Sequence, residues 1–449
     1  MSKPKPERGE PRVIIVGGGF GGVACAQALD KHDIPALLVD RNDYHQFQPM
    51  LYQLATAQVG ATDIAFPLRG IFHPDGNVTV KTAMVASIDP ATRSCTTTDG
   101  VTYSGEVLVV AAGATANFFG VTGAAEHAFP LYSVDDANAL RSRVLGALDA
   151  VDADPEHLAQ GGFSFVVVGG GATGVETAGA LSEFLRDVAP HFYPKAPLDQ
   201  AVVTLVEHGP GVLNGFSEQA RDYARDKLVE LGVTLRFGVA VEEVRKDAVV
   251  LGDGSSITTR TVIWAAGEQP ASIVADAGLP LGRGGRVDVA PDLTVAGFEG
   301  VYAVGDAANI VGKDGAILPQ LGSVAQQSGK CAGENIVAAF GDKETKPFHY
   351  RDKGIMAMIG RDAAVAELGP KRHEVDGVVA FGSWLGVHAM LLSSLKQKVG
   401  AFIDWGWDYF STRRPEYLAD RPGAYAIDWG DDSTAGRPSA GEPSEEIAG

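Results

Sequence analysis

The sequence predicts an α/β fold built from two parallel-sheet units, and three observations lead to that prediction. Glycine accounts for 56 of the 449 residues, and the glycines gather in short loops after apolar runs. The order strand, glycine loop, helix, strand and terminal acid occurs twice, and strands that alternate with helices indicate parallel sheets with right-handed crossovers. Hydrophobic residues make up 45% of the chain, which is ample for a packed core.

Short, β-branched apolar runs mark the expected strands, because strands buried on both faces of a parallel sheet have this composition. These runs lie at residues 12–16, 36–39, 107–112, 163–168, 201–206, 261–266 and 300–304.

The first glycine loop has the spacing GxGxxG directly after a strand, and Asp40 ends the next strand. In such a loop Gly17 makes the tight turn, Gly19 lets the backbone approach a pyrophosphate, and Gly22 lets the helix pack on the strand. The helix N-terminus supplies N–H donors to the phosphates, and the acid accepts hydrogen bonds from ribose hydroxyls. This combination predicts a dinucleotide site.

A second loop repeats the fingerprint with Gly169, Gly171 and Gly174, and Glu207 ends the strand that follows. The separation between Gly174 and Glu207 is longer than usual, and the intervening segment looks like an insertion. Since a carboxylate repels a 2′-phosphate and accepts from a 2′-hydroxyl, we expect NADH rather than NADPH. Two nucleotide sites predict two cofactors, or one cofactor and one substrate.

Composition excludes several classes of protein. The chain has 37 Lys and Arg against 56 Asp and Glu, a net charge of −19, which argues against binding to nucleic acid. Cys25, Cys95 and Cys331 lie far apart and form no zinc spacing, disulfide framework or CxxxxC pair, and no metal site is expected. Because no signal peptide or membrane-spanning run is visible, we expect a reduced, cytoplasmic setting.

Beyond the two loops, several segments resemble the type II NADH:quinone oxidoreductases, a family of flavoproteins with two dinucleotide-binding domains. Residues 47–56 (FQPMLYQLAT) and 63–69 (DIAFPLR) closely match family segments that line the flavin. Residues 294–308 (TVAGFEGVYAVGDAA) are similar to the family's second FAD signature. The resemblance extends from about residue 12 to about residue 417.

This resemblance implies that the first loop binds FAD and the second binds NADH. It implies further cofactor contacts from Gln53, Thr56 and Asp306, and it places Gly113 and Gly267 at the crossovers between the domains. The implied activity is that of a NADH dehydrogenase that pumps no protons and passes two electrons from NADH through FAD to a membrane quinone, either menaquinone or ubiquinone.

The full prediction is an α/β fold with two Rossmann-like domains and a C-terminal amphipathic helical membrane-docking region. A discontinuous FAD-binding domain (10–129 and 269–345) contains the inserted NADH-binding domain (130–268). The membrane-docking region spans 346–417, and an acidic, disordered tail spans 418–449.

Glu176 follows the second loop, where the family has an acid near the contact between nicotinamide and flavin. There it would orient the nicotinamide or relay a proton; the alternative is an acid at the start of a helix that contacts nothing. The family's quinone motif AQxAxQ aligns with residues 322–327. Gln327 keeps the second glutamine as a catalytic candidate, and Ser323, Gln326 and Gln327 are the candidate quinone-binding residues. Because Ser323 replaces the first glutamine, the acceptor stays open.

Apolar residues recur at three- and four-residue spacing within residues 381–417, at Trp384, His388, Leu391, Leu395, Val399 and Phe402. This predicts an amphipathic helix pair with aromatic and basic flanks, of a kind that can lie in a headgroup region. Ordinary core or a homodimer seam would give the same pattern, but the resemblance favours peripheral docking on the cytoplasmic face of the cell membrane. A soluble NADH-oxidising flavoenzyme that uses oxygen or another small acceptor, and a flavoprotein NADH redox sensor, are the alternative functions.

Overall fold

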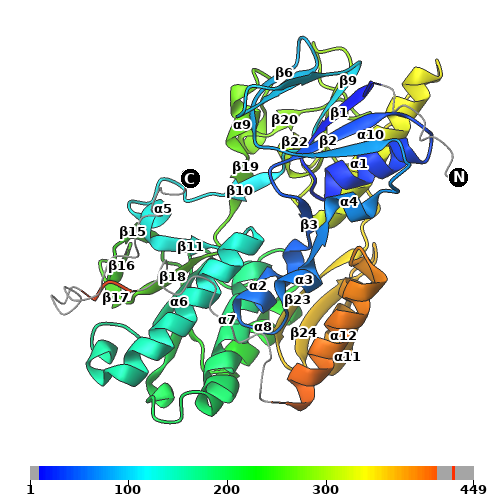
Figure 1. Cartoon of the computed structure of the whole chain (residues 1–449). Coiled ribbons are helices and arrows are strands. Elements are labelled where there is room, and N and C mark those ends of the chain that lie inside the picture. The colour runs from blue at the N-terminus through cyan, green and yellow to red at the C-terminus, as the bar shows by residue number, and fades with distance from the viewer. Residues whose placement is uncertain (1–9, 412–426, 430–449) are drawn as a thin grey trace, which may run out of the picture.

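The computed structural model describes residues 10–411 and 427–429 and shows two sheet-based units joined by a narrow connection (Figure 1). The predicted acidic tail lies outside the described residues except for 427–429. The seven strands expected from the sequence are all present.

The first unit is a five-stranded parallel sheet in the order β21-β9-β1-β2-β5. Its strands are β1 (Val13–Val16), β2 (Ala36–Asp40), β5 (Val78–Thr82), β9 (Val107–Val110) and β21 (Val301–Ala303). Helices α1 (Phe20–Asp30) and α10 (Gly322–Phe340) pack together beside it. Their backbones touch where a Cβ added at Gly329 would lie 2.0 Å from the carbonyl oxygen of Gly21, so only glycine fits there.

The second unit is also a five-stranded parallel sheet, in the order β11-β18-β12-β13-β14. Its strands are β11 (Ala128–Pro130), β12 (Ser164–Val168), β13 (Val202–Glu207), β14 (Thr234–Phe237) and β18 (Thr261–Trp264). Its helices include α6 (Val134–Ala153), α7 (Ala172–Glu183) and α8 (Glu218–Glu230). The internal duplication read from the sequence therefore extends to four strands of each sheet, while the fifth, edge strand comes last in the chain in the first sheet (β21) and first in the second (β11).

The chain crosses between the units at a two-stranded antiparallel ribbon of β10 (Ala114–Ala116) and β19 (Glu268–Pro270). Figure 1 shows this ribbon at the connection between the sheets. The crossover precedes the predicted boundary at residue 129, because β11 already pairs with β18 of the second sheet.

Both units also contain short helices and strands outside the two parallel sheets. They are β3 (Tyr44–Gln46), α2 (Leu51–Ala55), α3 (Ala61–Ile64), β4 (Ala65–Pro67), α4 (Leu68–Ile71), β6 (Val85–Asp89), β7 (Ser94–Thr97), β8 (Thr102–Ser104), α5 (Ala124–His127), β15 (Val241–Val244), β16 (Ala248–Leu251), β17 (Ser256–Thr258), α9 (Ser272–Asp276), β20 (Val287–Asp288) and β22 (Ala308–Asn309).

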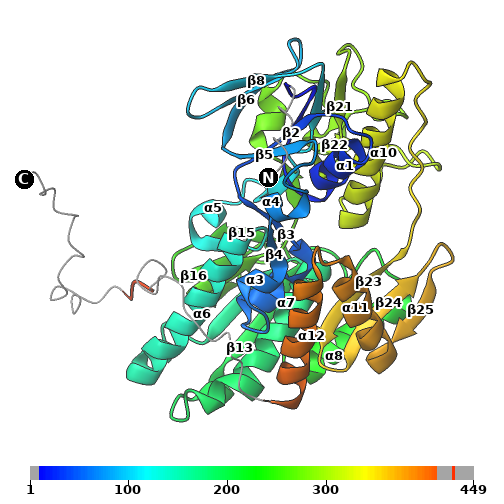
Figure 2. The same ribbon diagram turned by 45° about the vertical axis from the view of Figure 1, so that its right-hand side comes forward.

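The C-terminal region differs from the purely helical prediction. It begins with an antiparallel sheet of β23 (Gly354–Gly360), β24 (Ala363–Leu368) and β25 (His373–Asp376), and the helices α11 (Gly377–Leu391) and α12 (Leu395–Phe410) follow. Figure 2 shows this region beside the second unit. It packs on α7, where a Cβ at Gly179 would lie 1.7 Å from the carbonyl oxygen of Ile359. One hydrophobic core joins α2, α6, α7, β23, β24 and both C-terminal helices.

Candidate functional site

The two glycine loops have nearly identical geometry. Gly17 and Gly169 both have φ of +109°, and a Cβ at either would lie 2.2 or 2.5 Å from a backbone carbonyl oxygen. A Cβ at Gly22 would lie 1.8 Å from the carbonyl oxygen of Gly17, and the same overlap at Gly174 is 1.9 Å. The sequence fingerprint is therefore explained by backbone contacts in both units.

The middle glycines face free space instead. A Cβ at Gly19 or at Gly171 would meet no heavy atom within 4 Å. Each residue is the N-cap of the helix that follows, α1 or α7, and no side chain caps either helix. Unpaired N–H groups at a helix start and an open approach form the arrangement that binds a pyrophosphate.

The two acids hold their loops in the same way. Asp40 accepts hydrogen bonds from the N–H groups of Gly18 (2.5 Å) and Asn42 (2.7 Å). Glu207 accepts from the N–H groups of Gly170 and Gly209, both at 2.6 Å. The acids predicted to face ribose hydroxyls therefore also fix the loops beside which a ribose would lie.

A cavity of about 380 Å³, here called the cofactor cavity, opens along the first loop. Asp40, Gly113 and Asp306, three of the predicted cofactor-binding residues, lie in its wall. The carboxyl oxygen Oδ1 of Asp306 is buried with no hydrogen-bond partner, and burial raises the pKa of Asp306 to about 6 although Arg286 opposes the shift. An unpaired buried acceptor and an open glycine loop fit a dinucleotide with a polyhydroxyl chain, so the residues present fit FAD.

A second cavity, also about 380 Å³, adjoins the first, because Gln48, Tyr132 and Asp306 belong to both walls. Gly267 and the start of α7 line this second cavity. The two nucleotide loops therefore face neighbouring spaces that meet near Asp306.

Sequence reasoning missed the polar groups between these cavities. Burial raises the pKa of Glu268 to about 7, with a further contribution from Asp306 and opposition from Tyr132 and Arg286. The pKa of Tyr132 is raised well above its usual value, chiefly by burial. Glu268 directly follows the crossover glycine Gly267, and this position in the sequence could have identified it as a residue of the site.

Gln53 and Thr56, for which the resemblance implies contact with the cofactor, are not among the residues that line the cofactor cavity. The carbonyl oxygen of the Gln53 side chain accepts a hydrogen bond from the indole N–H of Trp405 at 3.0 Å, which ties α2 to α12. The Thr56 hydroxyl donates to the carbonyl oxygen of Tyr52 at 2.9 Å within α2. From this segment, Gln48 and Leu51 are among the residues that reach the second cavity.

Glu176 lies at the second cavity, as predicted, and is only 8% exposed. One carboxyl oxygen accepts the N–H of Met358 in β23 at 3.1 Å. Burial raises the pKa of Glu176 to about 8, although that hydrogen bond and the neighbouring Trp384 oppose the shift. The alternative of a helix-start acid without a partner is therefore wrong, and the carboxyl is held protonated at neutral pH beside the cavity.

The predicted quinone residues on α10 lie elsewhere. The Ser323 hydroxyl is 2.9 Å from the hydroxyl of Tyr350, and the Gln327 amide pairs with both backbone groups of Arg351. Gln326 is exposed. Ser323, Gln326 and Gln327 line neither cavity, whereas Gly322, at the start of α10, lines the second. Ser323 and Gln327 therefore fix the segment that leads from α10 to β23.

The predicted apolar stripe divides between core and surface. Trp384 is fully buried and stacks on His388, with ring centroids 3.8 Å apart, and His388 lines the second cavity. Among the described residues, eleven of the nineteen exposed large hydrophobics lie on α11 and α12. They are Val378, Val379, Val387, Met390, Leu391, Leu395, Val399, Phe402, Ile403, Trp407 and Tyr409, here called the apolar face.

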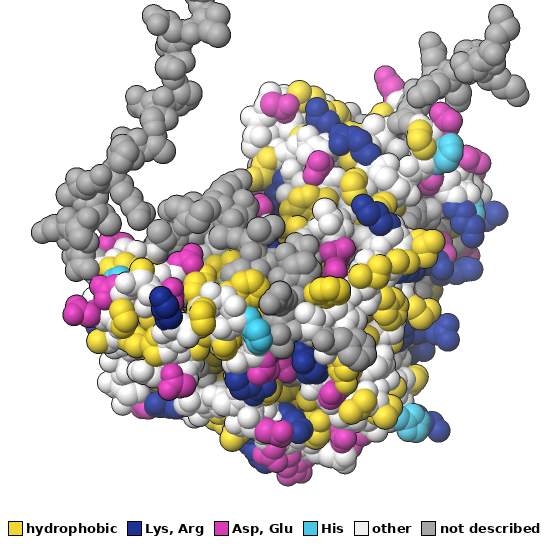
Figure 3. All heavy atoms as spheres, turned by 60° about the horizontal axis from the view of Figure 1, so that its bottom comes forward, with side chains coloured by type: hydrophobic (Ala, Val, Ile, Leu, Met, Phe, Trp, Pro, Cys, Tyr) yellow, Lys and Arg dark blue, Asp and Glu magenta, His cyan; other side chains and the backbone are white. Residues whose placement is uncertain are grey.

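A patch of this size usually marks an interaction site. The lower side of the molecule shows hydrophobic side chains interspersed with both basic and acidic ones (Figure 3). Within the described part of the chain, no helix is long and apolar enough to cross a bilayer.

Cys25 and Cys331 are poorly suited to thiolate chemistry. Burial raises the pKa of the Cys25 thiol to about 12 and that of Cys331 to about 11, so neither forms a thiolate at neutral pH.

Comparison with known proteins identifies the family of the chain. The family model of pyridine nucleotide-disulphide oxidoreductases matches residues 11–329. The type II NADH:quinone oxidoreductase Ndh of Mycobacterium tuberculosis is 34% identical, covering 92% of this chain and 91% of that protein. NdhA of the same organism is 33% identical over 94% of this chain and 92% of its own.

Solved structures share the fold. The structure of NDH2 from Plasmodium falciparum in complex with NADH has a TM-score of 0.84 at 18% identity, covering 91% of this chain and 99% of that one. The sulfide:quinone oxidoreductase of Aquifex aeolicus has a TM-score of 0.67 at 20% identity, covering 87% and 92%. The resemblance inferred from the sequence is confirmed: the chain belongs to the type II NADH:quinone oxidoreductases, within the pyridine nucleotide-disulphide oxidoreductases.

Proposed function

We propose that the protein oxidises NADH and passes two electrons through FAD to a quinone at a membrane surface. The observation that carries the proposal is the pair of adjoining cavities, each reached by one of two duplicated glycine loops. Family membership supports it, since the M. tuberculosis relatives are named NADH:quinone oxidoreductases.

In the cofactor cavity, the loop at Gly19 and the start of α1 would hold the FAD pyrophosphate. Asp40 would accept from the adenosine ribose, and the unpaired oxygen of Asp306 would accept from the ribityl chain. When bound, FAD supplies the redox centre that accepts a hydride and returns electrons to a second substrate.

At the second loop, Gly171 and the start of α7 would hold the pyrophosphate of NADH. Glu207 would accept from the 2′-hydroxyl of the adenosine ribose. The protein thereby orients both nucleotides toward the meeting point of the cavities, beside Asp306 and Glu268.

The apolar face supports docking on a membrane, for which we propose the cytoplasmic side. Lys396 and Lys398 lie on the same helix as Leu395 and Val399, so basic groups flank the apolar ones. A homodimer seam is the other use of this face, and the experiment below separates the two.

The first test is steady-state oxidation of NADH with menaquinone and ubiquinone analogues, with the bound flavin identified by its spectrum. Quinone reduction well above the rate with oxygen supports the proposal. Oxygen as the better acceptor supports the soluble flavoenzyme, and a long-lived reduced flavin with negligible turnover supports the redox sensor.

The docking test uses full-length variants, because truncation after residue 380 would remove Trp384 and Trp405 from the core. Phe402→Glu places a charge on the apolar face, and Val229→Glu on α8 is the control at an equally exposed site (53% and 58%). We expect only Phe402→Glu to lose sedimentation with anionic liposomes while both keep activity with ferricyanide. Unchanged liposome binding together with a dimer that becomes a monomer would instead support the seam.

A further inference from the structure

Three residues of the predicted acidic tail lie on the second unit. They are Ile427, Asp428 and Trp429, here called the docked segment. Figures 1 and 2 show this short red piece beside β16, on the side of the second unit away from α11 and α12. The sequence predicted a disordered tail over residues 418–449, so the contacts of these three residues are a correction that needs a physical cause.

Trp429 is held by its indole ring. The ring stacks on that of His157 in the 3₁₀ turn Pro155–Leu158, with centroids 3.8 Å apart and an angle of 22° between the planes. The guanidinium carbon of Arg260 lies 5.5 Å from the Trp429 centroid, which is within the range of a cation–π contact. A Cβ added at Gly162 would lie 3.1 Å from Cη2 of Trp429, so the lack of a side chain there leaves room for the ring. Three separate segments of the second unit therefore contact one indole.

Asp428 contacts positively charged side chains. Its carboxylate pairs with the ammonium of Lys246, which lies between β15 and β16. Its carbonyl oxygen accepts a hydrogen bond from Nη1 of Arg260 at 3.2 Å. Burial, and then the nearby charge of Arg260, lower the pKa of Arg143 on α6 to about 10, so a third cation lies in this area. An acid before the tryptophan therefore matches the charge of this surface.

Contacts within the second unit already position the side chains of this surface. Nδ1 of His157 lies 3.2 Å from the carbonyl oxygen of Ala150, and Nε of Arg260 donates to the carbonyl oxygen of Gln160 at 3.0 Å. Since neither contact involves the docked segment, its arrival orders few side chains, which lowers the entropic cost of binding. Ile427 adds an apolar contact, because it packs against the large hydrophobic core.

The chain's own segment has an advantage over that of a second copy. Residues 411–426 join it to the end of α12 at Phe410. A segment linked over this length reaches its site at an effective concentration of roughly 1 mM, against roughly micromolar for a second copy in a dilute assay. The docked segment adds no strand to the sheets of the second unit, and the Asp428 side chain stays 67% exposed. It can therefore leave its site without unfolding the unit.

We propose that His157, Lys246 and Arg260 form a binding site for a short peptide in which an acid precedes tryptophan, and that the docked segment of the same chain occupies this site reversibly. While it is docked, the chain that follows α12 is tied back to the second unit. None of the three side chains lines the cofactor cavity or the second cavity, so the inference goes beyond the proposed function and does not depend on it.

The test adds a fluorescein-labelled peptide of residues 424–432 (AYAIDWGDD) to the full-length protein and follows the anisotropy of the label. In Trp429→Ala the chain's own segment loses its ring contacts and leaves the site open to the peptide. We expect the peptide to bind Trp429→Ala about 10-fold more tightly than wild type, in which the linked segment competes. The same peptide with alanine in place of its tryptophan should bind neither protein.

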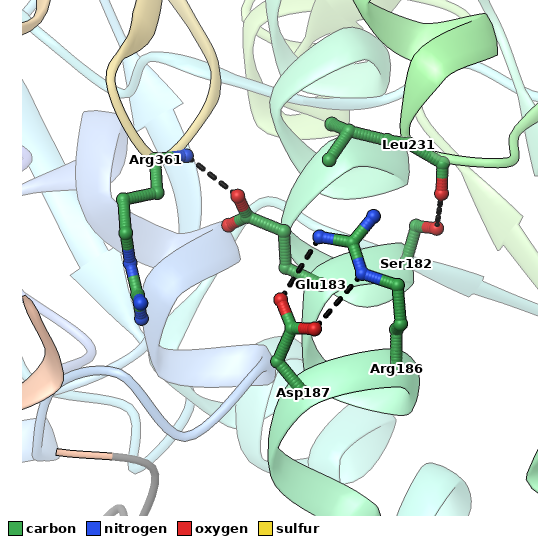
Figure 4. A network of polar contacts seen from close by, with 6 residues as sticks. All are labelled: Ser182, Glu183, Arg186, Asp187, Leu231 and Arg361. Atoms are coloured by element: carbon green, nitrogen blue, oxygen red, sulfur yellow. Dashed lines mark hydrogen bonds and ion pairs between the residues drawn. The ribbon is translucent and has the colours of Figure 1, made fainter.

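Two further variants are made in the Trp429→Ala chain. Lys246→Glu reverses the charge that meets the acid of the peptide and should weaken binding about 5-fold or more. Arg186→Glu is the matched control, since Arg186 is an exposed cation like Lys246 (49% and 54%) and pairs with Asp187 in the π-helical turn Phe184–Val188 (Figure 4). It should leave binding unchanged, and an unchanged midpoint of urea unfolding shows that each variant is folded.

Equal affinity of the peptide for wild type and Trp429→Ala, or equal weakening by Lys246→Glu and Arg186→Glu, would overturn the site. Light scattering on wild type and Trp429→Ala checks the occupant. A wild-type dimer that becomes a monomer in Trp429→Ala would place the segment on a second copy and overturn docking within one chain, whereas an unchanged mass supports it.

Discussion

Replacing Glu207 with glutamine should raise the use of NADPH relative to NADH. The substitution removes one negative charge and almost preserves the shape of the side chain. The position of the charge is well defined, because the carboxylate is fixed by the N–H groups of Gly170 and Gly209 at 2.6 Å each. A 2′-phosphate on a nucleotide bound at this loop would lie against that charge.

The size of the effect follows from Coulomb's law. Two unit charges 4 Å apart interact by about 1 kcal/mol in water and about 4 kcal/mol at an effective dielectric constant of 20. Glu207 is half-buried, so the repulsion lies between these limits. Because about 1.4 kcal/mol is a factor of ten, the ratio of kcat/KM for NADPH to that for NADH should rise about 10-fold or more.

The assay is steady-state oxidation of each nucleotide with ferricyanide, so that the quinone step does not enter. Glu218→Gln, which removes an exposed acid at the start of α8, is the control and should leave the ratio unchanged. The glutamine can still accept one of the two N–H groups, so we expect a stability cost of only about 1 kcal/mol. An unchanged ratio in a folded Glu207→Gln variant would refute the assignment of Glu207 to the ribose.

Three further predictions concern stability. Gly174→Ala should prevent the second unit from folding stably, because the added Cβ would lie 1.9 Å from the carbonyl oxygen of Gly169. The yield of folded, soluble protein measures this effect, and a yield equal to that of the wild type would contradict the prediction. Trp405→Phe leaves the buried side-chain oxygen of Gln53 unpaired and should cost about 1–3 kcal/mol of unfolding free energy in urea titrations, while no change would show that the contact is dispensable. Burial raises the pKa of Glu176 from 4.5 to about 8 in the folded protein. Between these two pH values the folded protein keeps a proton on Glu176 that the unfolded chain loses. The free energy of unfolding contributed by this group therefore falls as the pH rises from 4.5 to about 8. Glu176→Gln should flatten that part of the pH dependence of unfolding, and an identical slope would disprove the burial argument.

The glycine loops were predictable because their constraint is local. Gly22 is required by its contact with Gly17 within one strand–turn–helix unit, and Gly17 is favoured by its own φ of +109°, so both leave a fixed spacing in the sequence. The position of Glu176 was likewise set by the loop that precedes it.

Contacts between distant segments were not predictable in this way. Gln327 binds the backbone of Arg351, and Gln53 binds Trp405, across 24 and 352 residues, so no local pattern records either pair. The sheet at residues 354–376 did have a signal, because two apolar runs flank the short turn at Arg361 and Asp362. The sequence prediction described the C-terminal region as helical because the apolar pattern of the helices that follow the sheet is stronger.

The helix α12 belongs to two environments. On one side Ala401 and Trp405 are part of the hydrophobic core, and on the other Phe402 and Ile403 are exposed. With this helix as the docking surface, no flexible tether separates the site from the lipid. The fold then sets the orientation of the molecule relative to the membrane plane and its distance from the headgroups. A lipid-borne acceptor meets the same edge of the protein at every encounter, and its search takes place in two dimensions instead of three.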